Sequence, residues 1–198
     1  MKAKARLAAR GFSQRPEVDY NETFAPTPAT PCIRLMAAMA CEMQLDFGYF
    51  DVQQDFVQAE LKEVVLVWMP QGCGAMTGRV VRLTRSLHAL KQASRSWHSY
   101  LVTRLKSLGF EWSLADACVF RLIEAGSVPV TAVVHVDDIF AVRGKERCDR
   151  FREDLTVQLP LTTLESCDGM LAANFSAQGH GLTDDFAEVF HGKNGQAI

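Results

Sequence analysis

The chain has 198 residues, of which 48% are hydrophobic, so it can build a substantial core and its length suits one domain or one domain with part of a second. Its net charge of −2 indicates no overall attraction to nucleic acid. The six cysteines form no CxxC pair, which argues against a zinc site or a disulfide framework. No signal peptide or apolar stretch of transmembrane length is present, so we expect an intracellular protein, cytoplasmic or nuclear, with no membrane partner.

Basic and acidic residues are separated along the chain. Residues 1–15 carry five basic residues and residues 73–110 carry seven, and neither stretch has an acidic residue. Such segregation is typical of a polyanion-binding surface beside an acidic, metal-binding centre, although chance and solvated faces are the alternative.

The first half of the chain predicts short alternating elements. Residues 3–13 alternate charged and small apolar side chains and could form a strand. Thr30 followed by Pro31 is typical of a helix start, and helical spacing of apolar residues continues to about residue 44. We then expect a strand over 47–52, a helix over 55–61, a strand over 64–69, a loop over 72–78 and a strand over 79–83.

The second half predicts two longer helices around a hairpin. Residues 93–108 repeat apolar residues at helical spacing, and Gly109 supplies a stop. A hairpin over 117–143 follows, with a weak extra turn at 124–126, and a second helix spans 145–159. Beyond residue 160 the pattern decays. We therefore predict an α+β fold with a mainly antiparallel sheet and helices packed on one face.

Two adjacent aspartates, Asp137 and Asp138, interrupt the apolar run over residues 130–142. Unpaired carboxylates are costly to bury and raise each other's pKa, so the pair is expected at a hairpin tip or around divalent cations. A solvated turn is the simpler reading. Two-metal phosphoryl transfer also needs a carboxylate from a neighbouring strand. Asp51 is the candidate, with Asp46 as its competitor at the other end of the same run.

Six blocks of sequence are similar, in order, to the reverse transcriptases of copia-type (Ty1/copia) retrotransposons. The resemblance covers roughly residues 2–159 and implies the fingers and palm of a right-hand polymerase. The blocks are KARLAARGFSQ at 4–14 with ETFAP at 22–26, FDVQQDFV at 50–57, RLTRSLHALKQASRSW at 82–97, LGF at 108–110, DACVF at 116–120 and HVDD at 135–138.

The resemblance implies a role for each matching residue. Asp51, Asp137 and Asp138 would be the catalytic residues and metal ligands, with Asp138 the more peripheral, and Mg²⁺ or Mn²⁺ would be the cofactor. Lys4 and Arg6 would contact the incoming triphosphate as a charge clamp.

Further positions are implied to contact the nucleotide or the nucleic acid. Phe56 and Gln92 would be nucleotide-binding, with a core phenylalanine as the alternative for Phe56. Lys91, Arg95 and His135 would lie near template or primer, with a solvated helix start as the alternative for Lys91, Gln92 and Arg95. Trp97 is expected to be a core residue rather than a stacking platform.

The chain departs from the family pattern at four positions. His135 stands for a tyrosine, Asp55 for a small residue beside the nucleotide, Ala89 for a glycine and Ser94 for a proline. The extra carboxylate of Asp55 would repel a triphosphate or displace a metal. Ala89 matters if the backbone there needs positive φ or a close approach.

The implied function is RNA-directed DNA polymerisation, a two-metal nucleotidyl transfer from dNTPs on an RNA/DNA primer-template. We expect residues 1–159 to be fingers and palm, lacking the upstream finger strands, and 160–198 to be a degraded, poorly ordered segment. Because thumb, RNase H and integrase are also missing, we expect little or no activity from this piece of a Pol polyprotein alone. The alternatives are a non-catalytic nucleic-acid-binding remnant and a non-functional translated fossil.

Overall fold

The computed structural model describes residues 7–123, 129–143 and 145–163. The chain divides into two compact units. Unit 1 comprises Met1–Pro26 and Gln54–Arg104, and unit 2 comprises Thr27–Gln53 and Leu105–Ile198.

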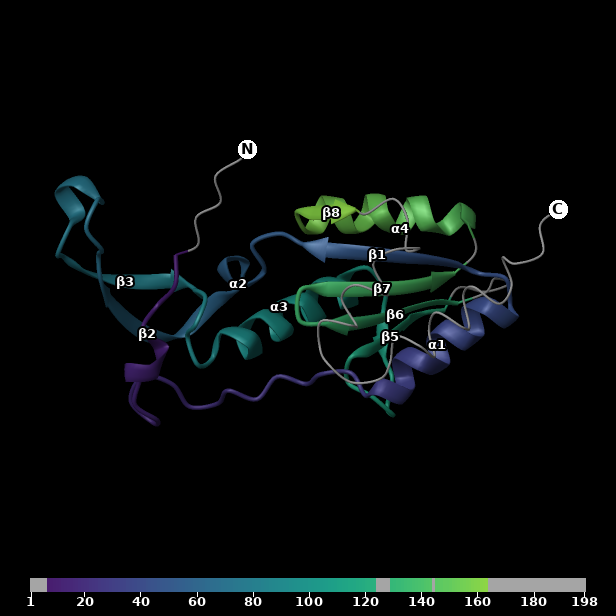
Figure 1. Ribbon diagram of the computed structural model, residues 1–198, viewed down its shortest axis with the longest axis horizontal. Coiled ribbons are helices and arrows are strands. Elements are labelled where there is room, and N and C mark those ends of the chain that lie inside the picture. The colour runs from purple at the N-terminus through teal and green to yellow at the C-terminus, as the bar shows by residue number, and fades with distance from the viewer. Residues whose placement is uncertain (1–6, 124–128, 144, 164–198) are drawn as a thin grey trace. The chain divides into compact units, whose positions relative to one another are not determined.

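Unit 2 is built around a six-stranded sheet in which every neighbouring pair is antiparallel. The spatial order is β4-β5-β6-β7-β1-β8, so β1 from early in the chain is inserted between the hairpin strand β7 and the late strand β8 (Figure 1). The strands are β4 (Glu111–Trp112), β5 (Val119–Leu122), β6 (Val130–His135), β7 (Asp138–Arg143), β1 (Asp46–Val52) and β8 (Leu161–Thr163).

Two helices cover opposite faces of this sheet (Figure 1). Helix α1 (Thr30–Glu42) shares an apolar core with the face that carries Tyr49 and Phe140. Helix α4 (Lys145–Gln158) contributes Phe151, whose ring meets that of Phe50 at 5.7 Å. Side chains alternate between the faces of a strand, so Tyr49 and Phe50 point in opposite directions and the two helices lie on different faces.

The prediction of helices on one face was therefore wrong. The burial of the central strands explains the difference. From Ile139 to Arg143 every residue of β7 is buried, and Ala132, Val133 and Val134 are buried in succession in β6. A strand covered on both faces reads as a continuous apolar run instead of an alternating one. The valine-rich hairpin carried that signal in the sequence.

The start of α1 is tied to the loop before β5. The Asp116 carboxylate accepts a hydrogen bond from the Ala29 amide at 2.9 Å, just before the helix begins at Thr30. The same side chain accepts a hydrogen bond from the Cys118 amide at 2.8 Å. Because the first amides of a helix lack partners within the helix, this carboxylate supplies one from 87 residues away in the chain.

Unit 1 contains a two-stranded antiparallel ribbon and short helices. Its small core groups Val65, Leu90 and Ala93, with Phe56 partly buried against them. The elements are the 3₁₀ turn η1 (Gly11–Ser13), α2 (Asp55–Gln58), β2 (Glu60–Trp68), the 3₁₀ turn η2 (Gly74–Met76) and β3 (Val80–Arg85), and α3 (Ala93–Ser107) begins in this unit.

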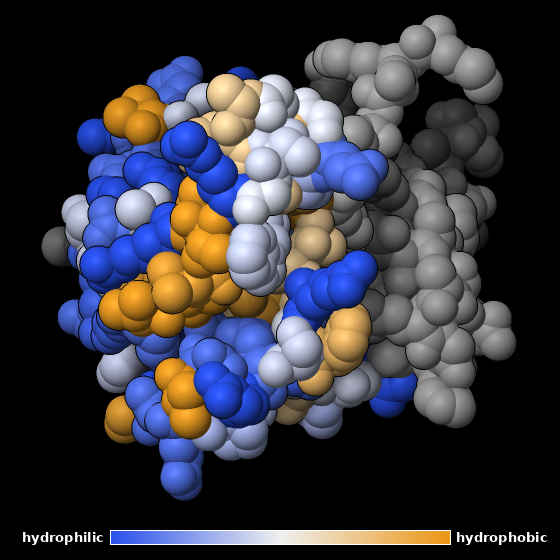
Figure 2. All heavy atoms as spheres, turned by 90° about the vertical axis from the view of Figure 1, so that its left-hand side faces the viewer, coloured by the Kyte–Doolittle hydropathy of each residue, from blue (hydrophilic) through white to orange (hydrophobic). Residues whose placement is uncertain are grey.

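One face of the β2–β3 ribbon is exposed. Along β2 the exposed and less exposed residues alternate, so Val64, Leu66 and Trp68 face solvent while Val65 is buried. Val80, the register partner of Trp68, is also exposed. Figure 2 looks from the end of the molecule where Figure 1 shows β2 and β3, and there hydrophobic residues are exposed among hydrophilic ones.

A tight backbone contact joins the N-terminal segment to the loop before α3. A Cβ on Gly11 would lie 1.7 Å from the carbonyl oxygen of Ala89, so only glycine fits there. Ala89 itself has φ +68°. The Ala9 amide also donates a hydrogen bond to the His88 carbonyl at 2.9 Å. The position where the family has glycine thus combines positive φ with a close approach.

Most predicted elements are present, with four differences. The expected strand over 3–13 is wrong in its described part, where Ala8 makes a single bridge to His88 and residues 11–13 form η1. The helix expected over 55–61 ends at Gln58, because residues from Glu60 onward join β2. Two short strands, β4 and β8, were not predicted. The turn expected at 124–126 lies outside the described residues.

The chain after residue 160 was expected to be irregular. Instead β8 pairs with β1, with Thr162 opposite Asp51, so at least this part is ordered by the sheet. Residues 164–198 lie outside the described residues. Among the residues that are described, no helix is both long enough and apolar enough to cross a membrane.

Candidate active site

The predicted carboxylates meet at one end of the unit 2 sheet. Asp51 on β1 is directly opposite Asp138 on β7, and Asp138 is in turn opposite His135 on β6. Asp137 lies in the turn between β6 and β7, and its carbonyl accepts a hydrogen bond from the Val52 amide at 2.9 Å. Asp46, the competitor of Asp51, lies at the opposite end of β1, where its backbone register partner is Arg143.

The turn that presents Asp137 is strained. Val136 has φ +58°, which is rare for a β-branched residue. Positive φ at the first central residue of a two-residue hairpin is the pattern of a type II′ turn, where glycine is usual. An L-residue with a side chain costs about 1–2 kcal/mol of conformational free energy in the left-handed region of φ and ψ. The surrounding β6–β7 ladder therefore holds the turn, and with it Asp137, in a conformation that valine does not prefer.

Asp138 is held from within the sheet by Tyr49. The Tyr49 hydroxyl donates a hydrogen bond to Asp138 Oδ1 at 2.5 Å. Tyr49 is two residues before Asp51 on the same strand and is 8% exposed. Sequence analysis missed this residue, although the alternation of a strand places it on the face of Asp51.

The electrostatics of the cluster reflect this crowding. Burial raises the pKa of the Asp138 carboxyl, the charges of Asp137 and Asp51 raise it further, and the Tyr49 hydrogen bond opposes them. Burial and the Asp138 carboxylate likewise raise the pKa of the Tyr49 phenol. A divalent cation would relieve the repulsion among the carboxylates.

The donor chemistry of this cluster fits Mg²⁺ or Mn²⁺. Both cations prefer oxygen ligands, and the cluster offers carboxylates from the adjacent strands β1 and β7 and from the turn between β6 and β7. Within the described residues, however, no three His, Cys, Asp or Glu side chains are gathered closely enough to hold a metal ion as they stand. The strands bring the carboxylates into register, and side-chain rotation would be needed to close a metal site.

The remaining predicted residues lie in unit 1 or outside the described residues. Lys4 and Arg6 lie outside the described residues. Phe56 is in α2, where its ring meets the His88 imidazole edge-on at 5.1 Å while one side packs on the unit 1 core. Lys91 is exposed. The predicted nucleotide and nucleic-acid contacts of these residues stay predictions.

Gln92 is buried and bonded to its own chain. Its side chain is 1% exposed, accepts a hydrogen bond from Gln14 Nε2 at 3.0 Å and donates one to the Asp19 carbonyl at 3.2 Å. The Gln14 side chain also accepts a hydrogen bond from the Lys91 amide. In this structure Gln92 anchors the N-terminal segment to the start of α3. Arg95, one turn further on, forms an ion pair with Glu22.

Two of the other sequence expectations can be placed. Trp97 is 1% exposed, so the prediction of a core residue is confirmed. Asp55, the departure expected to disturb a triphosphate, is 5% exposed in the first turn of α2, so its carboxylate is turned into the protein.

Comparison with known proteins assigns the family. The chain matches the reverse transcriptase (RNA-dependent DNA polymerase) family over residues 1–188. It therefore belongs to that family, and the resemblance inferred from the sequence is confirmed. Within the family it is a reverse transcriptase domain of the copia type, as the following relatives show.

The curated relatives are polyproteins of transposons. The chain is 36% identical over 138 residues to a retrovirus-related Pol polyprotein from transposon RE2 of Arabidopsis thaliana, a match that spans 69% of this chain and 9% of the relative. It is 30% identical over 146 residues to that of transposon TNT 1-94 of Nicotiana tabacum, spanning 73% of this chain and 11% of the relative. The transposon Ty1-H Gag-Pol polyprotein of Saccharomyces cerevisiae is 30% identical over 145 residues, 69% of this chain and 7% of the relative. No solved structure matches.

Proposed function

We propose that this chain forms the fingers and palm of a right-hand polymerase that copies RNA into DNA by two-metal nucleotidyl transfer. The observation that carries the proposal is the register of β1, β6 and β7. It brings Asp51 opposite Asp138 and puts Asp137 in the adjoining turn, within a chain that belongs to the reverse transcriptase family. Phosphoryl transfer of this class needs carboxylates from adjacent strands to hold two cations.

In this proposal residues 1–159 are the fingers and palm, with the sheet of unit 2 as the palm and unit 1 as the fingers. The antiparallel sheet, with helices on both faces, gives the carboxylates a rigid base, because central strands buried on both sides are the least mobile part of a fold. The strained turn at Val136 limits the orientations open to Asp137.

Asp51, Asp137 and Asp138 would hold Mg²⁺ or Mn²⁺. When bound, the cations would lower the pKa of the primer 3′-hydroxyl and neutralise charge on the dNTP phosphates. The protein residues supply the rest. The carboxylates fix where the cations bind, and the exposed basic residues of unit 1 attract the phosphate backbone of an RNA/DNA primer-template.

Metal uptake tests the proposal directly. We would measure Mn²⁺ binding by calorimetry with primer-template and dNTP present, in the wild type, in Asp137→Ala and in a control, Asp154→Ala, which removes an exposed carboxylate of α4. The expected result is uptake in the wild type and the control and none in Asp137→Ala. Uptake that is absent from the wild type, or unchanged in Asp137→Ala, would refute the assignment.

Extension of a labelled primer on an RNA template measures the chemistry itself. The same series applies, and any product should require the divalent cation and Asp137. Because the match spans only about a tenth of each polyprotein relative, we expect low turnover from this chain alone.

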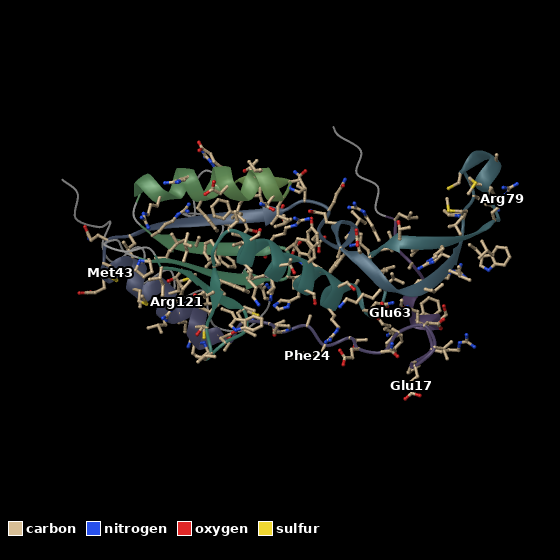
Figure 3. All side chains as sticks on the ribbon, turned by 180° about the vertical axis from the view of Figure 1, so that it is seen from behind. Glu17, Phe24, Met43, Glu63, Arg79 and Arg121 are labelled. Atoms are coloured by element: carbon tan, nitrogen blue, oxygen red, sulfur yellow. The ribbon has the colours of Figure 1, made fainter. Side chains whose placement is uncertain are left out.

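Binding of nucleic acid without catalysis is the second candidate, and the exposed basic side chains of unit 1 favour it. Arg79 lies near the tip of the β2–β3 ribbon (Figure 3). Arg82 and Arg85 follow along β3, and all three residues are exposed. Retained, salt-sensitive binding of primer-template by an Asp137→Ala, Asp138→Ala double variant, together with no synthesis by the wild type, would support this reading over the first.

A further inference from the structure

Tyr49 is a side chain of the site that the family resemblance did not single out. It belongs to β1, its ring is buried at 8% exposure, and its hydroxyl is 2.5 Å from Asp138 Oδ1. Its register partner across the β1–β7 ladder is Phe140, so the contact with Asp138, two residues before Phe140 in β7, is a diagonal one.

The ring of Tyr49 has little freedom. It is tilted against the Phe140 ring at a centroid distance of 5.3 Å and belongs to the apolar core shared with Met36, Ala37 and Ala40 of α1. A close-packed core keeps such a ring in one rotamer. The hydroxyl therefore emerges at a fixed point beside the carboxylates.

A fixed donor orients the carboxylate that it contacts. Hydrogen bonds to an ionised oxygen are short and roughly twice as strong as neutral ones, so the bond from Tyr49 restrains rotation of the Asp138 carboxylate. Asp138 also faces Asp51 on one side and His135 on the other. The orientation of the Asp138 carboxylate therefore sets how close its charge lies to Asp51 and His135.

We propose that Tyr49 is a positioning residue, whose hydroxyl holds Asp138 in the orientation that sets the cation affinity of the carboxylate cluster. This rests on the proposed function, because it assigns a role within that cation site. It also distinguishes the paired aspartates. Asp138 is held from the core by Tyr49, whereas Asp137 is aimed by the strained turn. Partners that orient a metal ligand typically change metal affinity by about 10–100-fold when removed.

Tyr49→Phe is the direct test, because it keeps the ring and removes only the hydroxyl. The matched control is Tyr100→Phe, a tyrosine of α3 whose ring lies under the Arg104 guanidinium. We expect Mn²⁺ uptake, measured with primer-template present, to weaken about ten-fold in Tyr49→Phe and to stay unchanged in Tyr100→Phe. Uptake equal to that of the wild type in Tyr49→Phe would overturn the proposal.

A double-mutant cycle asks whether Tyr49 acts through Asp138. In an Asp138→Asn background, Tyr49→Phe should have no further effect on Mn²⁺ uptake. A further ten-fold loss in that background would refute action through Asp138. If the role of Tyr49 is confined to packing, Tyr49→Phe leaves cation affinity unchanged in both the wild-type and the Asp138→Asn background.

The same four proteins, unfolded thermally without metal, separate this inference from the proposed function. Non-additive destabilisation by Tyr49→Phe and Asp138→Asn is expected if the hydrogen bond exists in solution, and additive effects would overturn the inference. Unchanged Mn²⁺ uptake in Asp137→Ala would refute the metal site instead, whatever the thermal cycle showed.

Discussion

Replacing Ala89 by glycine is expected to stabilise the protein. Ala89 has φ +68°, and its methyl group is exposed, so removing the methyl costs little packing. An L-residue in the left-handed region costs about 1–2 kcal/mol relative to glycine. Glycine in turn gives the unfolded chain more freedom, which costs about 0.4–1 kcal/mol. The balance favours glycine by about 1 kcal/mol.

The Ala89 carbonyl cannot escape this conformation by a local shift. It faces the Cα of Gly11 so closely that a Cβ there would lie 1.7 Å from the oxygen. The neighbouring Ala9–His88 hydrogen bond and the bridge of Ala8 to His88 hold the same two segments together. The strain is therefore maintained by the docking of the N-terminal segment.

Thermal unfolding followed by circular dichroism checks this prediction. For a chain of this size, a gain of about 1 kcal/mol should raise Tm by about 2–4 °C. The control is Ala117→Gly, another exposed alanine, which does not have positive φ. The Tm of Ala117→Gly should fall, because glycine gives the unfolded chain more freedom and no backbone strain is relieved in the folded state. A Tm that falls equally in both variants would refute the argument that Ala89 is strained.

Two further predictions concern unit 2. Burial raises the pKa of the Cys118 thiol to about 12. Iodoacetamide at pH 8 should therefore leave Cys118 unmodified in the native protein while it labels the partly exposed Cys73. Peptide mass spectrometry measures both modifications, and equal rates of labelling would contradict the prediction. Burial would raise the pKa of Asp116, but hydrogen bonds from the Ala29 and Cys118 amides outweigh it and hold this pKa below its ordinary value. A depressed pKa contributes stability that is present above the unfolded-state value near pH 4 and is lost as pH falls through the folded-state value. Asp116→Asn should therefore lower the free energy of unfolding by about 1 kcal/mol at pH 7 and by progressively less as the pH falls. Urea unfolding of both proteins at pH 7 and in acid checks this, and an equal difference under the two conditions would count against it.

Much of the site followed from local sequence. An adjacent pair of carboxylates inside a valine-rich run predicts a hairpin tip, because the flanking residues favour strands and the charges cannot be buried. The structure has β6, a two-residue turn and β7 at this point. The choice of Asp51 over Asp46 rested on the family resemblance, and the register explains it, since only Asp51 is level with Asp138.

The sequence also determined the family and the longer helices, because helical periodicity and ordered motifs are local properties of the chain. Tertiary structure decided the order of the strands. Pairing β1 with β7 and β8 joins residues about 90–110 positions apart, and no local pattern encodes such a pairing. It also decided that helices cover both faces of the sheet, since α1 precedes β1 and α4 follows β7, and the two helices share one sheet only because these strands pair.

The role of individual side chains depended most on tertiary contacts. Gln92 matches a nucleotide-binding position in sequence, yet its amide is bonded to Gln14 and Asp19. Tyr49 carries no motif, yet it contacts an aspartate 89 residues away. The sequence by itself could name the carboxylates and the family. Only the packing of α1 and β1 against β7 decided which neighbour orients them, because a hydrogen bond depends on distances that the fold sets.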